Sequence, residues 1–252
     1  MLSNDDALKS FGNSLNVAVF GASGGIGTAF IEKFIELNTI KTLHAFSRQK
    51  SRQTHSKLVW HQTTFDDSSL AIQALPFVKQ NMHFDIILVA IGLLHEGDKL
   101  QPEKSWRSLD TDSLFKLFNA NAIIPALIAK NFLPLLNKNS KSIFAALSAR
   151  IGSITDNKSG GWHSYRASKA ALNMLLKNFS LELMRTNSNA LCVGLHPGTV
   201  NTNLSRPYQR NINTNNLFSP HYSVDSLLKV IDTLEIEQSG CVFAWDGQEI
   251  KP

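Results

Sequence analysis

The sequence has few cysteines and no long hydrophobic run, and each absence excludes a class of protein. Two cysteines cannot cross-link a fold of 252 residues, which excludes a disulfide-stabilised scaffold. No apolar run reaches the ~18 residues of a membrane span. The first fifteen residues lack the basic start and apolar segment of a secretory signal. We therefore expect a reduced, cytoplasmic protein that has no membrane partner.

The composition also lacks the low hydrophobicity and high net charge of a disordered chain. Apolar residues make up 43% and charged residues 18%, as in ordinary globular proteins. The net charge is +5, but the basic residues are scattered and no nucleic-acid motif accompanies them. The eight histidines show no metal-ligand spacing. We expect a folded chain that binds neither nucleic acid nor metal.

Short apolar runs alternate with amphipathic stretches along most of the chain. The expected strands are 16–20, 41–47, 57–62, 84–92, 141–148, 190–196 and 240–245, and the expected helices are 28–37, 68–77, 113–136, 165–185 and 224–234. Such alternation predicts an α/β fold in three layers, a parallel sheet of about seven strands with helices on both faces. We expect an N-terminal arm over residues 1–15 and one domain over residues 16–252.

A glycine-rich turn, GASGGIG at 21–27, lies between the first expected strand and the first expected helix. Glycine permits a sharp turn and a close approach to a pyrophosphate, and the helix start offers free N–H groups to phosphates. A plain strand-to-helix turn is the alternative. The context favours a dinucleotide site, whose expected contacts are Gly21, Ser23, Gly25, Ile26 and Gly27.

Tyr165 and Lys169 lie four residues apart on an expected helix, so both face the same side. An ammonium group near a phenol lowers the pKa of the phenol, and such a tyrosine can exchange a proton with a carbonyl oxygen. Such a pair alone can also be a surface contact. In one chain with the glycine turn, it indicates chemistry on a carbonyl or an alcohol.

These features resemble those of the short-chain dehydrogenase/reductase family, and in particular its C-factor-like subgroup. The matching stretches are GLLH at 92–95, PEK at 102–104, SARIGSI at 148–154, GGWHSYRASK at 160–169 and WDG at 245–247. The resemblance implies a single Rossmann-type domain and hydride transfer with a nicotinamide dinucleotide. It also implies that Tyr165 is the general acid/base, that Lys169 holds the nicotinamide ribose and that Asn121 positions a water.

The resemblance further implies which backbone segments flank the cofactor. Pro197-Gly198-Thr199-Val200 matches the family segment that lies along the nicotinamide, so Pro197, Gly198 and Val200 are expected contacts. The stretch Val89-Ala90-Ile91-Gly92 replaces the usual family pattern N-N-A-G. Ala90 and Gly92 keep the backbone of that segment, and we expect them beside the cofactor.

The family serine is the main departure from the pattern. The family commonly has S-x-x-G after the fifth strand, and counting back from Gly152 gives Ala149. Ser148 lies one residue earlier, and a one-residue shift on a strand turns a side chain to the opposite face. Beyond the strand end the chain can curl, and then Ser148 or Ser153 supplies the hydroxyl that hydrogen-bonds the substrate oxygen; otherwise no serine has this role. We favour Ser148.

The end of the second expected strand bears on the choice of cofactor. It reads Phe46-Ser47-Arg48 and lacks the carboxylate that binds the ribose hydroxyls of NAD. Arg48 can pair with a 2′-phosphate and Ser47 can hydrogen-bond the same group. Lys50 and Arg52 add positive potential nearby. We therefore expect NADP(H) in preference to NAD(H).

The combined pattern predicts an NADP(H)-dependent oxidoreductase that reduces a small-molecule carbonyl or oxidises a secondary alcohol. The alternative is a regulatory or signalling protein that binds a dinucleotide with weak or no turnover, which fits Ala149 and the altered 89–92 stretch. The family resemblance also implies a homodimer or homotetramer. We expect the loop at 201–221 to decide substrate specificity.

Overall fold

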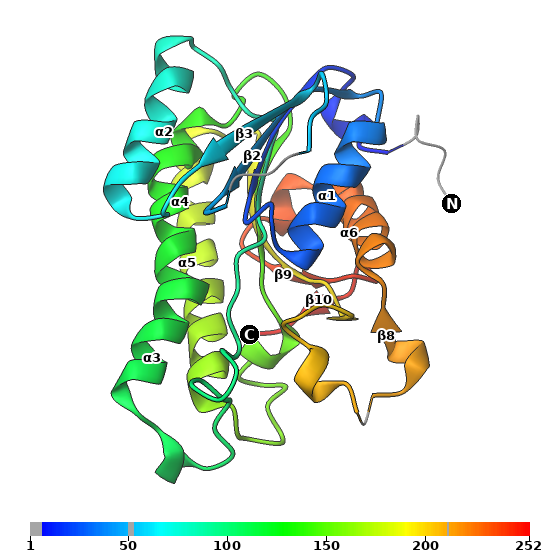
Figure 1. Ribbon diagram of the computed structural model, residues 1–252. Helices are drawn as coiled ribbons and strands as arrows, with labels where there is room; N and C mark the ends of the chain where they lie inside the picture. Colours follow the sequence, from blue (N-terminus) through cyan, green and yellow to red (C-terminus); the bar gives the residue numbers. More distant parts are fainter. Residues whose placement is uncertain (1–6, 50–52, 211) are drawn as a thin grey trace.

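The computed structural model describes residues 7–49, 53–210 and 212–252. In this part of the chain, eight strands form a central sheet between two layers of helices (Figure 1). In spatial order they are β10 (Glu249–Ile250), β9 (Val242–Ala244), β6 (Ala190–His196), β5 (Ser142–Leu147), β4 (Ile86–Val89), β1 (Leu15–Phe20), β2 (Ile40–Ser47) and β3 (Leu58–Gln62). Neighbouring strands are parallel except β9 and β10. The predicted Rossmann-type α/β fold is confirmed.

The helices cover both faces of the sheet (Figure 1). Helices α1 (Gly25–Glu36) and α6 (Pro220–Thr233) lie on one face, and α2 (Asp67–Lys79), α4 (Ile124–Phe132) and α5 (His163–Thr186) lie on the other. Helix α3 (Thr111–Phe118) continues into α4 through a π-helical turn, and β7 (Thr199–Val200) pairs with β8 (Leu217–Phe218) outside the main sheet. No helix within the described ranges is long and apolar enough to cross a lipid bilayer.

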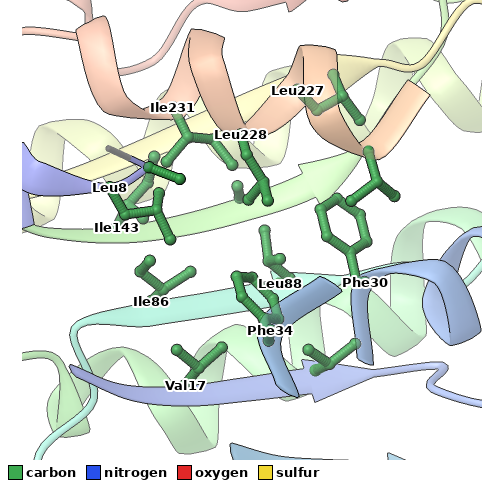
Figure 2. Packing of buried hydrophobic residues seen from close by; sticks show 14 of the residues in the cluster. Leu8, Val17, Phe30, Phe34, Ile86, Leu88, Ile143, Leu227, Leu228 and Ile231 are labelled. Carbon is green, nitrogen blue, oxygen red and sulfur yellow. The ribbon is translucent and has the colours of Figure 1, made fainter. Parts of the chain in front are cut away.

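The middle strands are apolar on both faces because helices bury both faces of a parallel sheet. In β4, Ile86 and Leu88 pack toward α1 and α6, whereas the alternate residues Ile87 and Val89 pack toward α2, α4 and α5. Figure 2 shows the first of these layers, where side chains of α1 and α6 meet the strand residues. The labelled helix residues are Phe30, Phe34, Leu227, Leu228 and Ile231.

The described part of the expected N-terminal arm is packed and not loose. Leu8 is fully buried and Phe11 is 4% exposed. Both belong to the core layer that contains α1 and α6, and Figure 2 shows Leu8 beside Ile231 and Ile143. Two buried apolar side chains are enough to attach a short segment to a domain, and the amphipathic pattern of so short a segment gives little signal.

Three local features differ from the expected elements. Strand β10 has two residues, which is too short for an alternating pattern to reveal. Helix α6 begins at Pro220 because Ser219 caps it, accepting a hydrogen bond from the Tyr222 N–H at 3.1 Å. The single helix expected over 113–136 is divided by the π-helical turn Asn119–Ile123, and Pro125 is the second residue of α4, which follows that turn.

The topology defines where a ligand can bind. The strand order changes direction between β1 and β4, since β2 and β3 lie on one side of β1 and β4 and β5 on the other. In open α/β sheets, ligands bind beyond the carboxyl ends of the strands at such a point. The glycine turn follows β1, and the Ala90–Gly92 backbone follows β4.

Candidate active site

The glycine turn is a backbone cradle in which side chains would collide. A Cβ atom on Gly27 would lie 2.1 Å from the Gly21 carbonyl oxygen, and one on Gly25 would lie 2.7 Å from the Thr202 Cγ2. The N–H groups of Gly21 and Ala22 donate to the Phe46 carbonyl at 2.9 and 3.1 Å, which fastens the turn to β2. The close approach of backbone segments therefore requires glycine at 27, and the Thr202 side chain leaves no room for a Cβ at Gly25.

The start of α1 fits an anionic group. Its N-cap residue is Gly24, which has no side chain to bond the first N–H groups of the helix. Those groups have no partner within the helix, and the helix dipole places partial positive charge there. Ser23, Gly24, Gly25 and Ile26 all border a cavity at this point. The geometry of the turn thus fits the pyrophosphate of a dinucleotide.

The cavity measures about 560 Å³ and lies beyond the carboxyl ends of β1, β4, β5 and β6. The expected site residues that line it are Ser23, Gly25, Ile26, Ala90, Gly92, Ser148, Tyr165, Lys169 and Pro197. The other expected site residues in the described ranges do not line it: Gly21, Gly27, Ser47, Arg48, Asn121, Gly198 and Val200. Among the described residues, no group of three or more His, Cys, Asp or Glu side chains is placed to hold a metal ion.

Tyr165 and Lys169 share one face of α5 and are both buried, with 8% and 3% exposure. The Lys169 Nζ donates to the Leu147 carbonyl at 2.8 Å and lies 5.9 Å from the centre of the Tyr165 ring. Burial raises the pKa of Tyr165 to about 12 and lowers the pKa of Lys169 to about 8. The expected lowering of the tyrosine pKa is wrong in this structure, because desolvation of the buried phenol raises that pKa. The phenol is protonated at neutral pH.

Asn121 is fully buried in the π-helical turn Asn119–Ile123, a rare geometry that is frequent at functional sites. Its Oδ1 accepts from the Leu93 N–H at 2.8 Å, and its Nδ2 donates to the Leu93 carbonyl at 2.9 Å and to the Ser168 Oγ at 3.0 Å. Both hydrogens of the Asn121 side-chain amide are already donated. Asn121 can therefore bind a water only as an acceptor, through its side-chain or backbone oxygen.

The structure separates the two candidate serines. Ser148 lines the cavity, and its hydroxyl donates to the Asn173 Oδ1 at 2.5 Å. The Ser153 hydroxyl donates to the Lys251 carbonyl at 2.5 Å, and Ser153 does not border the cavity. Ser148 is therefore the candidate that the fold brings to the site, with its hydroxyl engaged by a neighbouring amide.

The residues expected to select the cofactor lie at the end of β2, beside the glycine turn. Ser47 is buried, and its hydroxyl donates to the Gln49 carbonyl. Arg48 is exposed, and its backbone carbonyl accepts from the Gln62 Nε2 at 3.2 Å. Lys50 and Arg52 lie outside the described residues.

Gly198 and Val200, the two expected cofactor contacts after Pro197, pack against other parts of the protein. Gly198 has φ +76, and a Cβ there would lie 2.5 Å from the Phe218 ring. Val200 is 4% exposed, in β7. Both follow Pro197, which lies after β6 and lines the cavity.

Sequence reasoning located the loop at 201–221 but not the individual residues that it brings to the site. Thr202 lines the cavity against Gly25, and Leu204 and Arg206 also line it. Tyr208 lies with its ring centre 5.0 Å from that of Trp162 and donates to the Gln101 Oε1 at 3.0 Å. No local spacing links these residues, so only the three-dimensional arrangement identifies them.

Comparisons with known proteins agree with this arrangement. The family model for short chain dehydrogenases matches residues 15–213. The chain is 36% identical over 140 residues to 1-hydroxy-2-glutathionyl-2-methyl-3-butene dehydrogenase of Rhodococcus sp. (strain AD45), covering 56% of this chain and 59% of that protein. It is 34% identical over 142 residues to C-signal of Myxococcus xanthus, covering 56% of this chain and 80% of C-signal. NADPH-bound carbonyl reductase from chicken fatty liver superposes with a TM-score of 0.81 at 25% identity, covering 95% of this chain and 94% of that one.

Proposed function

The chain belongs to the short-chain dehydrogenase family, and from this premise we propose that it is an NADP(H)-dependent oxidoreductase that reduces a carbonyl group or oxidises a secondary alcohol. One observation carries the proposal. The glycine turn, Tyr165 and Lys169 come from distant parts of the sequence and line one cavity. That cavity therefore combines a place for a dinucleotide with a buried proton donor.

Different residues of the site would bind the cofactor and transfer the proton. The glycine turn and the start of α1 would hold the pyrophosphate, and Ala90, Gly92 and Pro197 would flank the rest of the cofactor. When bound, the nicotinamide supplies or accepts the hydride. Lys169, fixed by the Leu147 carbonyl, would hold the nicotinamide ribose. Tyr165 would give its phenol proton to the carbonyl oxygen during reduction, and its high pKa keeps that proton in place at neutral pH.

The preference for NADP(H) is a further part of the proposal. It is supported by Arg48, an exposed arginine at the end of β2 next to the glycine turn, and by the lack of a carboxylate in Phe46-Ser47-Arg48. The test is a fluorescence titration of the purified protein with NADPH and with NADH. Tight NADPH binding with weak NADH binding supports the assignment, and the reverse preference would contradict it.

Turnover tests the activity itself. Quinones and aldehydes are offered with NADPH, and loss of NADPH absorbance is followed for the wild type and for Tyr165→Phe. We expect turnover with the wild type and its loss in the variant, because phenylalanine has no proton to give. Reduction at equal rates by both proteins would contradict the role of Tyr165.

One observation favours the alternative of a dinucleotide-binding signalling protein. Ala149 occupies the position of the family serine, and the hydroxyl of Ser148 is engaged by Asn173. C-signal, one of the relatives, bears a signalling name. Tight NADPH binding without turnover of any carbonyl in the screen would favour this alternative over the enzyme.

We also propose that the protein forms a homodimer or homotetramer. The support is apolar surface on α3 and α5, where Phe115, Met174 and Met184 are 70%, 63% and 64% exposed. Sedimentation equilibrium of the wild type and of Phe115→Glu tests this, and a wild type that is monomeric at micromolar concentration would contradict it.

A further inference from the structure

Helix α5 begins without the side-chain cap that helix starts usually have. Its N-cap residue is Trp162, which has φ +51 and makes no capping bond through its side chain. The first N–H groups of a helix have no partner within it, and leaving a buried N–H unbonded costs about 1–3 kcal/mol. Tyr165, whose position matters most for proton transfer, is the third residue of this helix.

Glu103 supplies the missing acceptors from 61 residues earlier in the chain. Its Oε2 accepts from the Ser164 N–H at 3.3 Å, and its Oε1 accepts from the Ser164 hydroxyl. Its backbone carbonyl accepts from the Trp162 N–H at 2.6 Å. Glu103 is 4% exposed and Ser164 is fully buried, so water competes little for these bonds.

A second set of polar contacts fixes α5 at Ser168, about one helical turn after Ser164. The Asn121 Nδ2 donates to the Ser168 Oγ, and the Ser168 hydroxyl donates to the Tyr165 carbonyl at 2.8 Å. Ser164 and Ser168 are four residues apart, so both lie on one face of the helix. The helix is thus fixed at two points that flank Tyr165, one through Glu103 and one through Asn121.

Glu103 also joins two walls of the cavity. It lies in the segment between β4 and the 3-10 helix Trp106–Ser108, and Leu93 and Leu94 of that segment line the cavity. The carboxyl group therefore ties the segment that carries these apolar residues to the helix that carries Tyr165. This connection consists of the hydrogen bonds that Ser164 and Trp162 donate to Glu103.

We propose that Glu103 is a positioning residue, which holds the first turn of α5 so that Tyr165 reaches the substrate oxygen in the geometry of proton transfer. The inference rests on the proposed hydride transfer, since it concerns the same site. A displacement of about 1 Å at a reacting group can cost about a hundredfold in rate. Loss of the carboxyl group should therefore lower kcat without weakening the binding of NADPH to the distant glycine turn.

The experiment compares Glu103→Ala with Glu103→Gln. We expect the alanine variant to lose about tenfold to a hundredfold in kcat, with the Kd for NADPH within about twofold of the wild type. We expect the glutamine variant to stay within about threefold in kcat, because its carbonyl can accept from the Ser164 N–H and its NH₂ can donate to the Ser164 Oγ. Amide hydrogen exchange at Ser164 and Tyr165 should accelerate in the alanine variant only.

Asp85 offers a matched control. It is a buried carboxyl group, 5% exposed, whose oxygens accept from the Asn16 N–H and the Asn137 Nδ2, each at 2.8 Å. It precedes the first residue of β4 and so lies at the sheet edge opposite the cavity. Asp85→Ala should lower the melting temperature while kcat of the folded protein stays within about twofold of the wild type.

Each outcome decides the proposal. A folded Glu103→Ala variant with unchanged kcat and exchange would overturn it, as would an equal kcat loss in Asp85→Ala. If Glu103→Ala does not fold, Ser164→Ala replaces it. That variant removes one of the bonds, so kcat should fall at least about threefold, and an unchanged kcat would again overturn the proposal. Absence of turnover in the wild type would contradict the proposed function, whereas the exchange data would still decide the role of Glu103.

Discussion

The two sides of the cavity are built by different means. The side proposed for the cofactor is a turn held by backbone bonds, such as Gly24 N–H to the Gly21 carbonyl at 3.0 Å and Gly21 N–H to the Phe46 carbonyl at 2.9 Å. The side that carries Tyr165 is held by side chains distant in sequence. Its bonds join Glu103 to Ser164, Asn121 to Ser168, Ser148 to Asn173, and Tyr208 to Gln101.

This difference means that cofactor binding and proton transfer should be separable by mutation. A change in the glycine turn should weaken dinucleotide binding, because the backbone itself forms the site. A change in the long-range polar bonds should slow turnover and leave dinucleotide binding intact. The following predictions test that separation, beginning with the largest expected effect.

Gly27→Ala should disrupt the glycine turn and weaken NADPH binding. The new Cβ would lie 2.1 Å from the Gly21 carbonyl oxygen, so the turn must open, and we expect the Kd for NADPH to rise about a hundredfold. Fluorescence titration measures this. Gly12→Ala is the control, because nothing lies within 4 Å of the Gly12 Cβ position, although its φ of +108 adds backbone strain that Gly27 does not carry. An unchanged Kd in Gly27→Ala would contradict the assignment of the turn.

The pH dependence of kcat/KM should test the side of the cavity that carries Tyr165 and Lys169. Burial lowers the pKa of Lys169 to about 8, so its ammonium form is complete below that pH and disappears above it, whereas Tyr165, with a pKa of about 12, keeps its proton. We expect kcat/KM for carbonyl reduction to fall about tenfold per pH unit above about pH 8. A kcat/KM that rises between pH 8 and pH 9.5 would contradict this reading.

Arg48→Ala should change cofactor choice without changing chemistry. If its guanidinium pairs with the 2′-phosphate as proposed, the loss of Arg48 should raise the Kd for NADPH about tenfold and leave the Kd for NADH within about twofold. Arg107→Ala removes an exposed arginine that lies over the Trp106 ring, and it controls for the general loss of positive charge. Equal effects of the two substitutions on NADPH binding would show that Arg48 has no specific role.

Ser148→Ala should have the smallest effect. The Ser148 hydroxyl already donates to Asn173, so its contribution to the substrate oxygen is small, and we expect kcat to fall about threefold. The Kd for NADPH should not change. A loss of a hundredfold or more would show that the hydroxyl leaves Asn173 and stabilises the substrate oxygen directly.

The difference between the two sides of the cavity also shows which parts of the site the sequence could predict. The glycine turn and the Tyr165–Lys169 pair are local patterns, and apolar strands buried on both faces give a strong signal. Asn173, Thr202 and Tyr208 have no such signal, because each acts through a partner that only the fold brings near. Glu103 lies in the matching stretch PEK, but that pattern does not indicate its partner Ser164. The raised pKa of Tyr165 has no local sequence signal either, since burial depends on the whole structure.

Transient kinetics of Tyr165→Phe tests the central claim most directly. The variant is first saturated with NADPH, and a single turnover with a quinone that the wild type reduces is then followed by absorbance. We predict an unchanged Kd for NADPH and a rate of turnover reduced about a thousandfold, within the range that general acid catalysis contributes. A rate within about threefold of the wild type would contradict the claim that Tyr165 is the proton donor of this site.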